Sequence, residues 1–459
     1  TGDIVKTGTG TLVLTGANTF TGDVTVNGGT LRVSTNDECI SNSSDIVVGA
    51  SGTFDVNSRT ETVASISGSG AITLGSGTLI AGGSGDTTYS GVMSGSNGNF
   101  TKQGSGTLTL SGNNSHTGAL TVSAGTVAIS EATDLAPATL TLSGGTLSAT
   151  ETLSLDSSRP FALATGTSSS VSVASGKTLT VAGVISGSGN LAKTGSGEAV
   201  LTATNTFTGS LTVSAGTLTV GAGSTAGSLA TSTIVSNATL AFNRSDTVTL
   251  STAVSGSGGV KQSGSGTLVM SGNNTYTGTT QVSAGTMQLG AADRIANTSA
   301  LLVDSGATFD ANSYSDTVGS VAGAGAVTLG SATLTAGGDG TSTIFSGTMT
   351  GTGGLTKAGA GTLTISGSPA FTGSTTISAG TVALSGSGSL PNSSALTVTG
   401  TFDLNGVSDT VGSIAGAGSI TLGSATLTSG GDNSSTTFSG IVSGTGAVTK
   451  SGSGTLTLS

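Results

Sequence analysis

Apolar and polar residues alternate in short runs along the whole chain. Leu108–Leu110 reads apolar, Thr, apolar, and the same order returns in Leu211–Val213 and Val327–Leu329. A period of two is typical of β-strands, because successive side chains of a strand point to opposite faces. We therefore expect Leu, Val, Ile and Ala to face a core. Thr and Ser should face outward, where β-branched Thr suits a strand.

Glycine separates these runs at regular distances. Val213 is followed by Gly216 and Leu218, and Val303 is followed by Gly306 and Phe309. A Gly between two short strands permits a bend with positive φ. Stacked strands that bend in this way form a parallel β-helix. The pattern therefore predicts an all-β chain, a parallel β-helix or β-solenoid, with no significant helix.

A phrase with fixed internal offsets recurs and sets the organisation of the chain. An aromatic residue or His lies ten residues after its first Gly, and further Gly residues lie at offsets twelve and nineteen. We interpret residues 1–459 as a single continuous β-helix, a fragment of a longer chain. Complete copies begin at Gly10, Gly106, Gly197, Gly266 and Gly361, and Gly454 begins another. The repeat units are approximately 10–105, 106–196, 197–265, 266–360 and 361–453, with 454–459 starting a further unit.

The spacing between copies indicates the number of coils. Subtracting successive start positions gives 96, 91, 69, 95 and 93 residues. The short third unit lacks roughly one coil of the solenoid, since deleting a whole coil keeps neighbouring coils in register. We expect about four coils of ~23 residues in a full unit, and about 20 coils in all.

The recurring phrase GTLxLSGxNxYTGxTxVxAGTL resembles the autotransporter-associated β-strand repeat, also called the passenger-associated transport repeat, of type V secreted proteins. The resemblance covers five complete copies and the start of a sixth. It implies a right-handed β-helix in the passenger of a large adhesin, and a place outside the cell or on the bacterial cell surface. Two copies depart from the phrase, with Glu198-Ala199 in place of Thr-Leu and Ser368-Pro369 where Asn is usual. Because Pro cannot donate to a ladder, we expect Pro369 to mark a loop.

Composition and charge narrow the possible partners. Only 7% of the residues are charged, 79 of the 459 are Gly, and the net charge is −10. No basic stripe is available to neutralise phosphates, so we expect no nucleic-acid partner. No apolar run approaches the ~20 residues of a membrane span, so we expect no transmembrane segment in this chain. The expected partners are flanking segments of the same longer chain, like rods, and a host or neighbouring cell surface.

Residues that could carry chemistry are few. The chain has one His and one Cys, so a Ser–His–acid triad or a histidine metal site has little to draw on. We interpret His116 as one member of a stack of aromatic side chains, and Cys39 as a loop residue without a chemical role. Surface charge explains Asp37 and Glu38. We therefore expect no enzymatic activity, no catalytic, cofactor-binding or metal-ligating residues, and no cofactor.

Two further polar patterns recur. The Asp and Asn of TFDVN at Thr53, TFDAN at Thr308 and TFDLN at Thr401 can satisfy turn amides, which we favour over metal binding. A Lys precedes most copies by four residues, and we expect these lysines to form a solvated stripe. They are Lys6, Lys102, Lys193, Lys357 and Lys450, with Lys261 five residues before its copy.

These observations favour a non-enzymatic extracellular structural rod, the passenger or stalk region of a large autotransporter-like adhesin or surface fibre. One alternative is a subunit of a self-assembling filament or sheath. Another is a β-helix that binds a polysaccharide or ice through its outward Thr rows. Against the last reading, the chain has only 11 Phe and 3 Tyr residues, and carbohydrate platforms usually expose aromatic rings.

Overall fold

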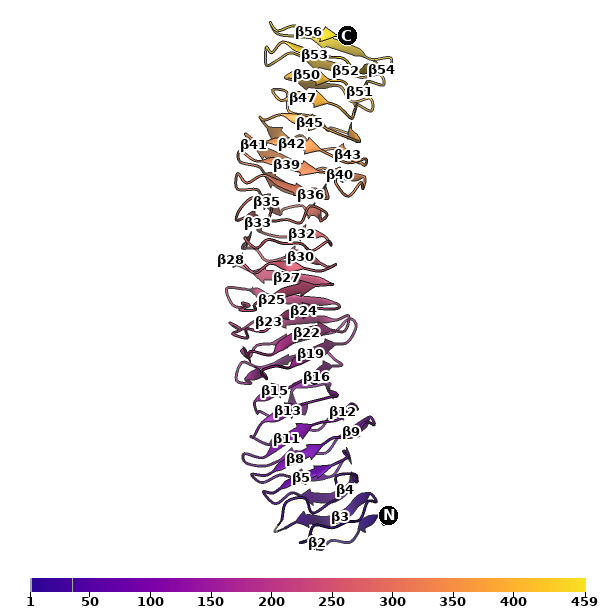
Figure 1. Cartoon of the computed structure of the whole chain (residues 1–459), viewed down its shortest axis with the longest axis vertical. Helices are drawn as coiled ribbons and strands as arrows, with labels where there is room; N and C mark the ends of the chain where they lie inside the picture. The colour runs from indigo at the N-terminus through magenta and orange to yellow at the C-terminus, as the bar shows by residue number, and fades with distance from the viewer. Residues whose placement is uncertain (1, 35) are drawn as a thin grey trace. The chain divides into compact units, whose positions relative to one another are not determined.

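The computed structural model describes residues 2–34 and 36–459, and its regular secondary structure consists almost entirely of short strands joined by turns and loops (Figure 1). They run from β1 (Ile4–Lys6) to β56 (Leu456–Leu458), and most contain three or four residues. Within these described residues the only helical element is a single 3-10 turn, η1 (Ala132–Asp134). The predicted all-β class is therefore confirmed. No helix in the described residues has the length and apolar character needed to cross a membrane.

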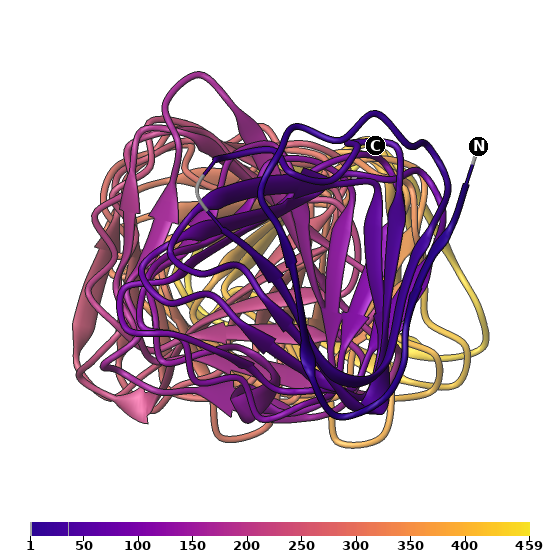
Figure 2. The same ribbon diagram turned by 90° about the horizontal axis from the view of Figure 1, so that it is seen from below.

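The chain forms two compact units. The first comprises Thr1–Ala222 and Ala226–Thr233, and the second comprises Gly223–Thr225 and Ile234–Ser459. Each is a parallel β-solenoid, in which a strand pairs with the strands one coil before and one coil after it. In the view of Figure 2, the loops of successive coils lie over one another.

One column of strands in the first unit shows the length of a coil. It contains β2 (Thr11–Leu14), β3 (Val24–Val33), β4 (Asp45–Asp55), β7 (Ala71–Thr73) and β10 (Met93–Ser94). The apolar residues Leu12, Leu31, Phe54, Ile72 and Met93 pair in this order, so that the coils advance by 19, 23, 18 and 21 residues. All of them are buried except Leu12, which lies on the first strand of the column and is exposed. The coils are thus somewhat shorter than the ~23 residues expected from the repeat spacing. The described residues make about 23 of them, close to the predicted 20.

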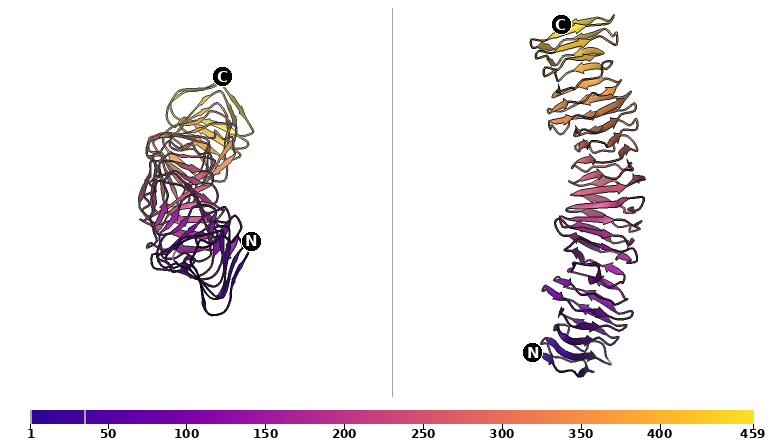
Figure 3. Two further views of the ribbon diagram at one scale, coloured as in Figure 1. Left: turned by 60° about the horizontal axis from the view of Figure 1, so that its bottom comes forward. Right: turned by 180° about the vertical axis from the view of Figure 1, so that it is seen from behind.

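The second unit stacks its strands in the same way (Figure 3). One sheet orders β28 (Thr247–Leu250), β31 (Thr267–Met270), β33 (Thr286–Leu289), β35 (Thr308–Asp310) and β38 (Ala326–Thr328). Their buried positions form a column of Val248, Leu268, Met287, Phe309 and Val327, although Val248 itself is only half-buried. The outward positions beside them are Thr247, Thr267, Thr286 and Thr308, followed by Ala326. The expected alternation of apolar inside and Thr outside is confirmed.

Glycine does two distinct jobs in the repeated phrase. The Gly at offset nineteen turns the corner between two strands with a positive φ, from 58° at Gly285 to 67° at Gly216. The Gly at offset twelve permits close approach of neighbouring coils. A Cβ on Gly209, for example, would lie 2.1 Å from the carbonyl oxygen of Gly189, one coil earlier. Any larger residue at either position would force the coils apart.

Candidate functional site

The repeated lysines lie inside the solenoid, at the corner that precedes each phrase. Lys193, on β22 (Asn190–Thr194), is 1% exposed. Its Nζ donates to the carbonyl oxygens of Thr194, Gly195 and Gly197 at 2.8–2.9 Å, and to Ala215 of the next coil at 3.2 Å. The predicted solvated stripe is therefore wrong. The Gly-rich corner points these carbonyls inward, where the Lys193 ammonium group donates to all of them.

The same carbonyl cage recurs in the other copies. Lys6, Lys102 and Lys357 are all less than 9% exposed, whereas Lys450 is exposed although it keeps the same local carbonyl partners. Among the described residues, no carboxylate forms an ion pair with these buried ammonium groups. Burial therefore lowers the pKa of Lys102 and Lys357, and lowers that of Lys193 to about 8.

One copy fills its cage with a different residue. Gln262 is 2% exposed, and its Nε2 donates to the carbonyls of Gly264 at 2.9 Å and Gly266 at 3.0 Å. Lys261, which precedes it, is on the outer face, because adjacent residues of a strand point to opposite sides. Lys261 lies one residue earlier than the lysines of the other copies, and it therefore points to the outer face of the strand instead of into the cage.

A buried Asn joins three coils in most copies of the phrase. Asn274 accepts the N–H of Val254 from the preceding coil at 2.9 Å and donates to the carbonyl of Arg294 in the next coil at 2.7 Å. Asn114 and Asn205 make equivalent bridges. Pro369 stands at this position in the copy that begins at Gly361 and cannot form the bridge. It lies outside the strands, as predicted, and β44 (Ala370–Phe371) begins directly after it.

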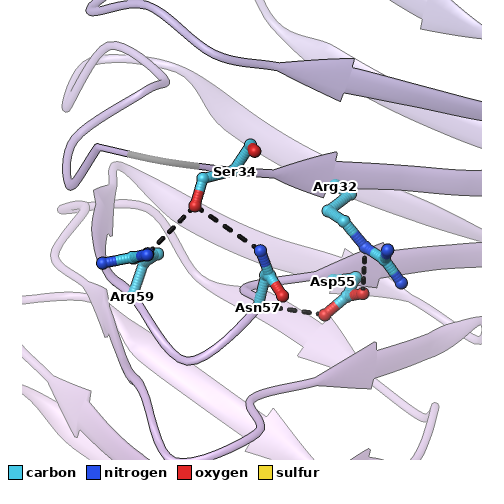
Figure 4. Close-up of polar contacts among 5 residues, drawn as sticks. All are labelled: Arg32, Ser34, Asp55, Asn57 and Arg59. Carbon is cyan, nitrogen blue, oxygen red and sulfur yellow. Dashed lines mark hydrogen bonds and ion pairs between the residues drawn. The ribbon is translucent and has the colours of Figure 1, made fainter.

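The FDxN segments form turns that also contact the preceding coil (Figure 4). Asp55 Oδ1 accepts the N–H of Asn57 at 2.9 Å, and Asn57 has a positive φ of 54°. Asn57 Nδ2 and Arg59 Nε both donate to the carbonyl of Ser34, at 3.5 and 2.9 Å. Asp55 Oδ2 lies 2.7 Å from Arg32 Nε. The Asp310 and Asp403 copies cap their turns in the same way, which confirms the predicted role of these residues in satisfying turn amides.

Three buried carboxylates hold loops of the preceding coil, and sequence reasoning missed them. Glu61, Asp316 and Asp409, here called the acid anchors, each lie eight residues after the first Thr of a TFDxN segment. Glu61 is fully buried and accepts the N–H groups of Cys39 and Ile40 at 2.9 and 2.7 Å. A recurring acid at a fixed distance from TFDxN was the only available signal.

The other two acid anchors repeat this arrangement. Asp316 accepts the N–H groups of Arg294 and Ile295 at 2.9 and 3.0 Å, and Asp409 accepts that of Leu390 at 3.0 Å. Burial raises the pKa of Glu61 to about 7, and raises the pKa values of Asp316 and Asp409 to about 6. Desolvation disfavours the charged form more strongly than the N–H groups favour it.

The remaining singled-out residues also serve packing. His116 is 2% exposed, at the position occupied by buried Phe207, Tyr276 and Phe371 in other copies, and burial lowers its pKa to about 4. Cys39 is buried in its loop. Asp37 and Glu38 are more than surface charge, because their carboxylates accept the N–H groups of the next coil at Thr60 and Thr62. In the described part of the chain, no group of three or more His, Cys, Asp or Glu residues is placed to hold a metal ion.

Comparison with known proteins identifies the repeated phrase. The family described as "Passenger-associated-transport-repeat" matches residues 4–33, 100–129, 191–220, 260–289, 355–384 and 448–459. Each complete match extends from the strand that carries the cage lysine, or Gln262, to the strand after the corner glycine. No solved structure matches the chain.

A curated relative matches nearly the whole chain. It is the "Adhesin BmaC autotransporter" of Brucella suis biovar 1 (strain 1330), which is 31% identical over 524 residues. The match covers 98% of this chain but only 15% of the relative, so this chain spans a small part of the length of that protein. Together, the six repeat matches and this relative show that the chain is an autotransporter-associated protein built from passenger-associated transport repeats.

Proposed function

We propose that this chain is part of the passenger of an autotransporter adhesin, displayed on the cell surface or secreted, where it acts as a non-enzymatic structural stalk. The repeat family and the relative named as an adhesin autotransporter support this placement. The role of that relative as an adhesin belongs to a much longer chain. A solenoid built from repeats can by itself serve as an extended stalk, which is one part of a long adhesin.

The observation that carries this proposal is how the recurring polar side chains are used. The cage lysines, the bridging Asn residues and the acid anchors all bind backbone groups of their own or a neighbouring coil. The buried members of these sets are therefore committed to joining coils. In a solenoid each coil contacts only its neighbours, so such joints are what an extended structure requires.

Deletion of whole repeats from the natural full-length protein tests the proposal. Removing residues 266–360 joins Ser265 to Gly361, so the copy that begins at Gly361 takes the place of the equivalent copy that begins at Gly266 and can pair with the preceding coil in the same register. We expect the shortened protein to remain at the cell surface, labelled on intact cells by an antibody to the remaining repeats. The distance to which the protein extends from the cell surface, measured by electron microscopy, should decrease. A signal seen only after permeabilising the cells would contradict surface display, and an unchanged distance would contradict the stalk.

A matched control separates the loss of a repeat from a loss of register. Removing 266–350 joins the chain at non-equivalent positions and so breaks the stacking of neighbouring coils. This variant should misfold or be degraded. If both deletions behaved alike, the in-register result would not report on a stacked stalk.

A further inference from the structure

The outer face of the second unit has a hollow where one cage lysine has been moved outward. The hollow has a volume of about 190 Å³ and is lined by Thr239, Gly259, Val260, Lys261, Thr279 and Gln281. These residues come from three consecutive coils, on β27 (Thr239–Arg244), on β30 (Gly259–Gln262), and on β32 (Thr280–Val282) with the residue before it. Gly259 pairs with Thr239 of the preceding coil and contributes no side chain to the outer face.

Lys261 brings an uncommitted positive charge to this hollow. It pairs with Ala241 on one side and Gln281 on the other, in the middle of the three coils. Other copies have Val5, Thr101, Ala192 and Thr356 at the equivalent outward position. In the part of the chain that the structure describes, the Lys261 ammonium has no hydrogen-bond or ion-pair partner, whereas the cage lysines are enclosed by carbonyls.

A backbone donor lies in the same hollow. In two other copies an Asn stands at the position of Gly259. Asn99 accepts the N–H of Ala119 at 2.8 Å, and Asn190 accepts that of Ser210 at 2.9 Å. Gly259 cannot do this for the equivalent Thr279 N–H, for which the described residues offer no acceptor. Thr279 is exposed, so this donor is open to solvent or to a ligand.

The remaining polar groups favour the same ligand chemistry. Thr239 and Thr279 contribute hydroxyl groups. The Gln281 amide donates to Asp304 Oδ2 of the next coil at 2.8 Å, and this carboxylate is not among the residues that line the hollow. An ammonium group, an amide N–H and two hydroxyls together suit an oxyanion. The volume is below the 300–1,000 Å³ typical of sites for a whole small molecule, so the hollow fits one group of a larger ligand.

We propose that the hollow around Lys261 binds the carboxylate or sulfate group of an acidic polysaccharide lying along the outer face. The polar, uncharged Thr hydroxyls beside it are available to the hydroxyl groups of the sugar. Because the chain carries a net charge of −10, its overall charge does not attract an anionic polymer, which therefore depends on local cations such as Lys261. This binding site goes beyond the stalk role and does not depend on it.

Exchanging two adjacent residues provides the sharpest test. The double variant K261Q/Q262K keeps the composition and net charge of the chain, returns a lysine to the carbonyl cage as in the other copies, and removes the outward cation. It should therefore fold. Binding of heparin fragments (sulfate and carboxylate) and alginate fragments (carboxylate) is measured by calorimetry at low ionic strength, with neutral dextran as the control polymer. We expect at least tenfold weaker binding of the acidic fragments by the exchanged protein, and no binding of dextran by either protein.

Further measurements distinguish this site from general charge attraction. Lys177→Ala, at an exposed lysine paired with Glu151, should leave the affinity unchanged. Equal binding by the wild-type and exchanged proteins would overturn the proposal, as would wild-type protein that binds neither acidic polymer. Free sulfate or glucuronate that binds as tightly as the fragments would also overturn it, because the ligand would then be a small ion. Circular dichroism and thermal melting of the exchanged protein confirm that it is folded.

Discussion

The repeats that begin at Gly106 and Gly266 anchor the same loop with side chains of opposite charge. In both repeats, a strand follows the corner glycine and a loop follows that strand. Backbone groups of this loop are bound by a buried polar side chain from the next coil. In the later repeat Asp316 accepts the N–H groups of Arg294 and Ile295. In the earlier repeat Arg159 donates instead to the carbonyls of Ala136 and Leu135, the latter at 3.3 Å.

The two loops expose opposite backbone groups because they differ in local structure. In the earlier repeat Asp134 caps its own loop, accepting the N–H groups of Ser130 and Glu131 at 2.8 Å. The carbonyls of that loop are then left to be satisfied, and Arg159 supplies the donors. Each anchor keeps one buried atom without a partner, Asp316 Oδ1 and Arg159 Nε. Buried backbone groups at this joint must be paired, whereas the charge of the pairing residue is free to vary.

Of the changes considered for these two repeats, removing Arg159 should cause the largest loss of stability. Arg159→Ala leaves the buried carbonyl of Leu135 without a donor, leaves that of Ala136 with only the N–H of Ala138, and opens a cavity. We expect a loss of roughly 3–4 kcal/mol of local stability. Hydrogen exchange of residues 131–138 measures it, since a solenoid need not unfold as one unit. Lys177→Ala, which breaks an exposed ion pair, should change exchange by less than ~1 kcal/mol. Unchanged protection in Arg159→Ala would show that the loop does not rely on the arginine.

The two anchors should also differ in their response to pH. The pKa of Asp316 is raised to about 6 from an ordinary 3.8, so the folded state binds the proton more tightly than the unfolded state does. Its contribution to stability therefore increases as the pH falls from about 7 to 4, by up to about 3 kcal/mol. Protection factors of residues 291–298, corrected for intrinsic exchange, should rise over this range.

The control for this pH effect is within the same molecule. Residues 131–138 are held by Arg159, which stays charged over that range, so their protection should not rise in parallel. Asp316→Asn should remove the rise at 291–298. Protection of the Asp316 loop that fell on acidification would contradict the sign of the effect.

The bridging Asn is common to both repeats and should matter equally in each. Asn114→Ala and Asn274→Ala each leave a buried N–H, of Met93 or Val254, without its acceptor. We expect each variant to lose about 2 kcal/mol, measured by denaturation and by exchange at those two N–H groups. A large difference between the variants would mean that the repeats differ in more than their anchors.

The cage should tolerate the exchange that the molecule already contains. Lys102→Gln gives the earlier repeat the cage residue of the later one, Gln262, and should cost less than ~1 kcal/mol. Lys102→Met removes every donor and should cost more, since the carbonyls of Gln103 and Gly104 lose theirs. Thermal melting of the two variants compares them directly. Equal losses would show that filling the space, and not hydrogen bonding, is what the cage requires.

Much of the fold was readable from local patterns. The alternation of apolar residues with Thr predicted the strands, and the glycines at offset nineteen predicted corners with positive φ, because both depend on a few adjacent residues. The FDxN turns were predictable for the same reason, since Asp55 binds the N–H two residues further along. The coil length was overestimated because one repeat unit does not hold a whole number of coils.

The polar interior was not readable in this way. The lysines looked like surface residues because charged side chains are rarely buried. Only the closed corner shows that the carbonyls of residues 194, 195, 197 and 215 surround Lys193. The acid anchors were missed because Glu61 and its partners Cys39 and Ile40 are more than 20 residues apart. The hollow at Lys261 required the register of three coils.

The sequence by itself determined that this chain is a solenoid of passenger-associated transport repeats. The two-residue alternation of the strands and the corner glycines are local features, and they recur in every complete copy of the repeat. The tertiary structure decided which polar groups are inside and what they bind. Stacking brings each residue against others about 20 positions away. A shift of one residue, as at Lys261 and Gln262, exchanges the two faces of a strand. Burial and partner choice depend on that alignment between coils, which no single stretch of the sequence contains.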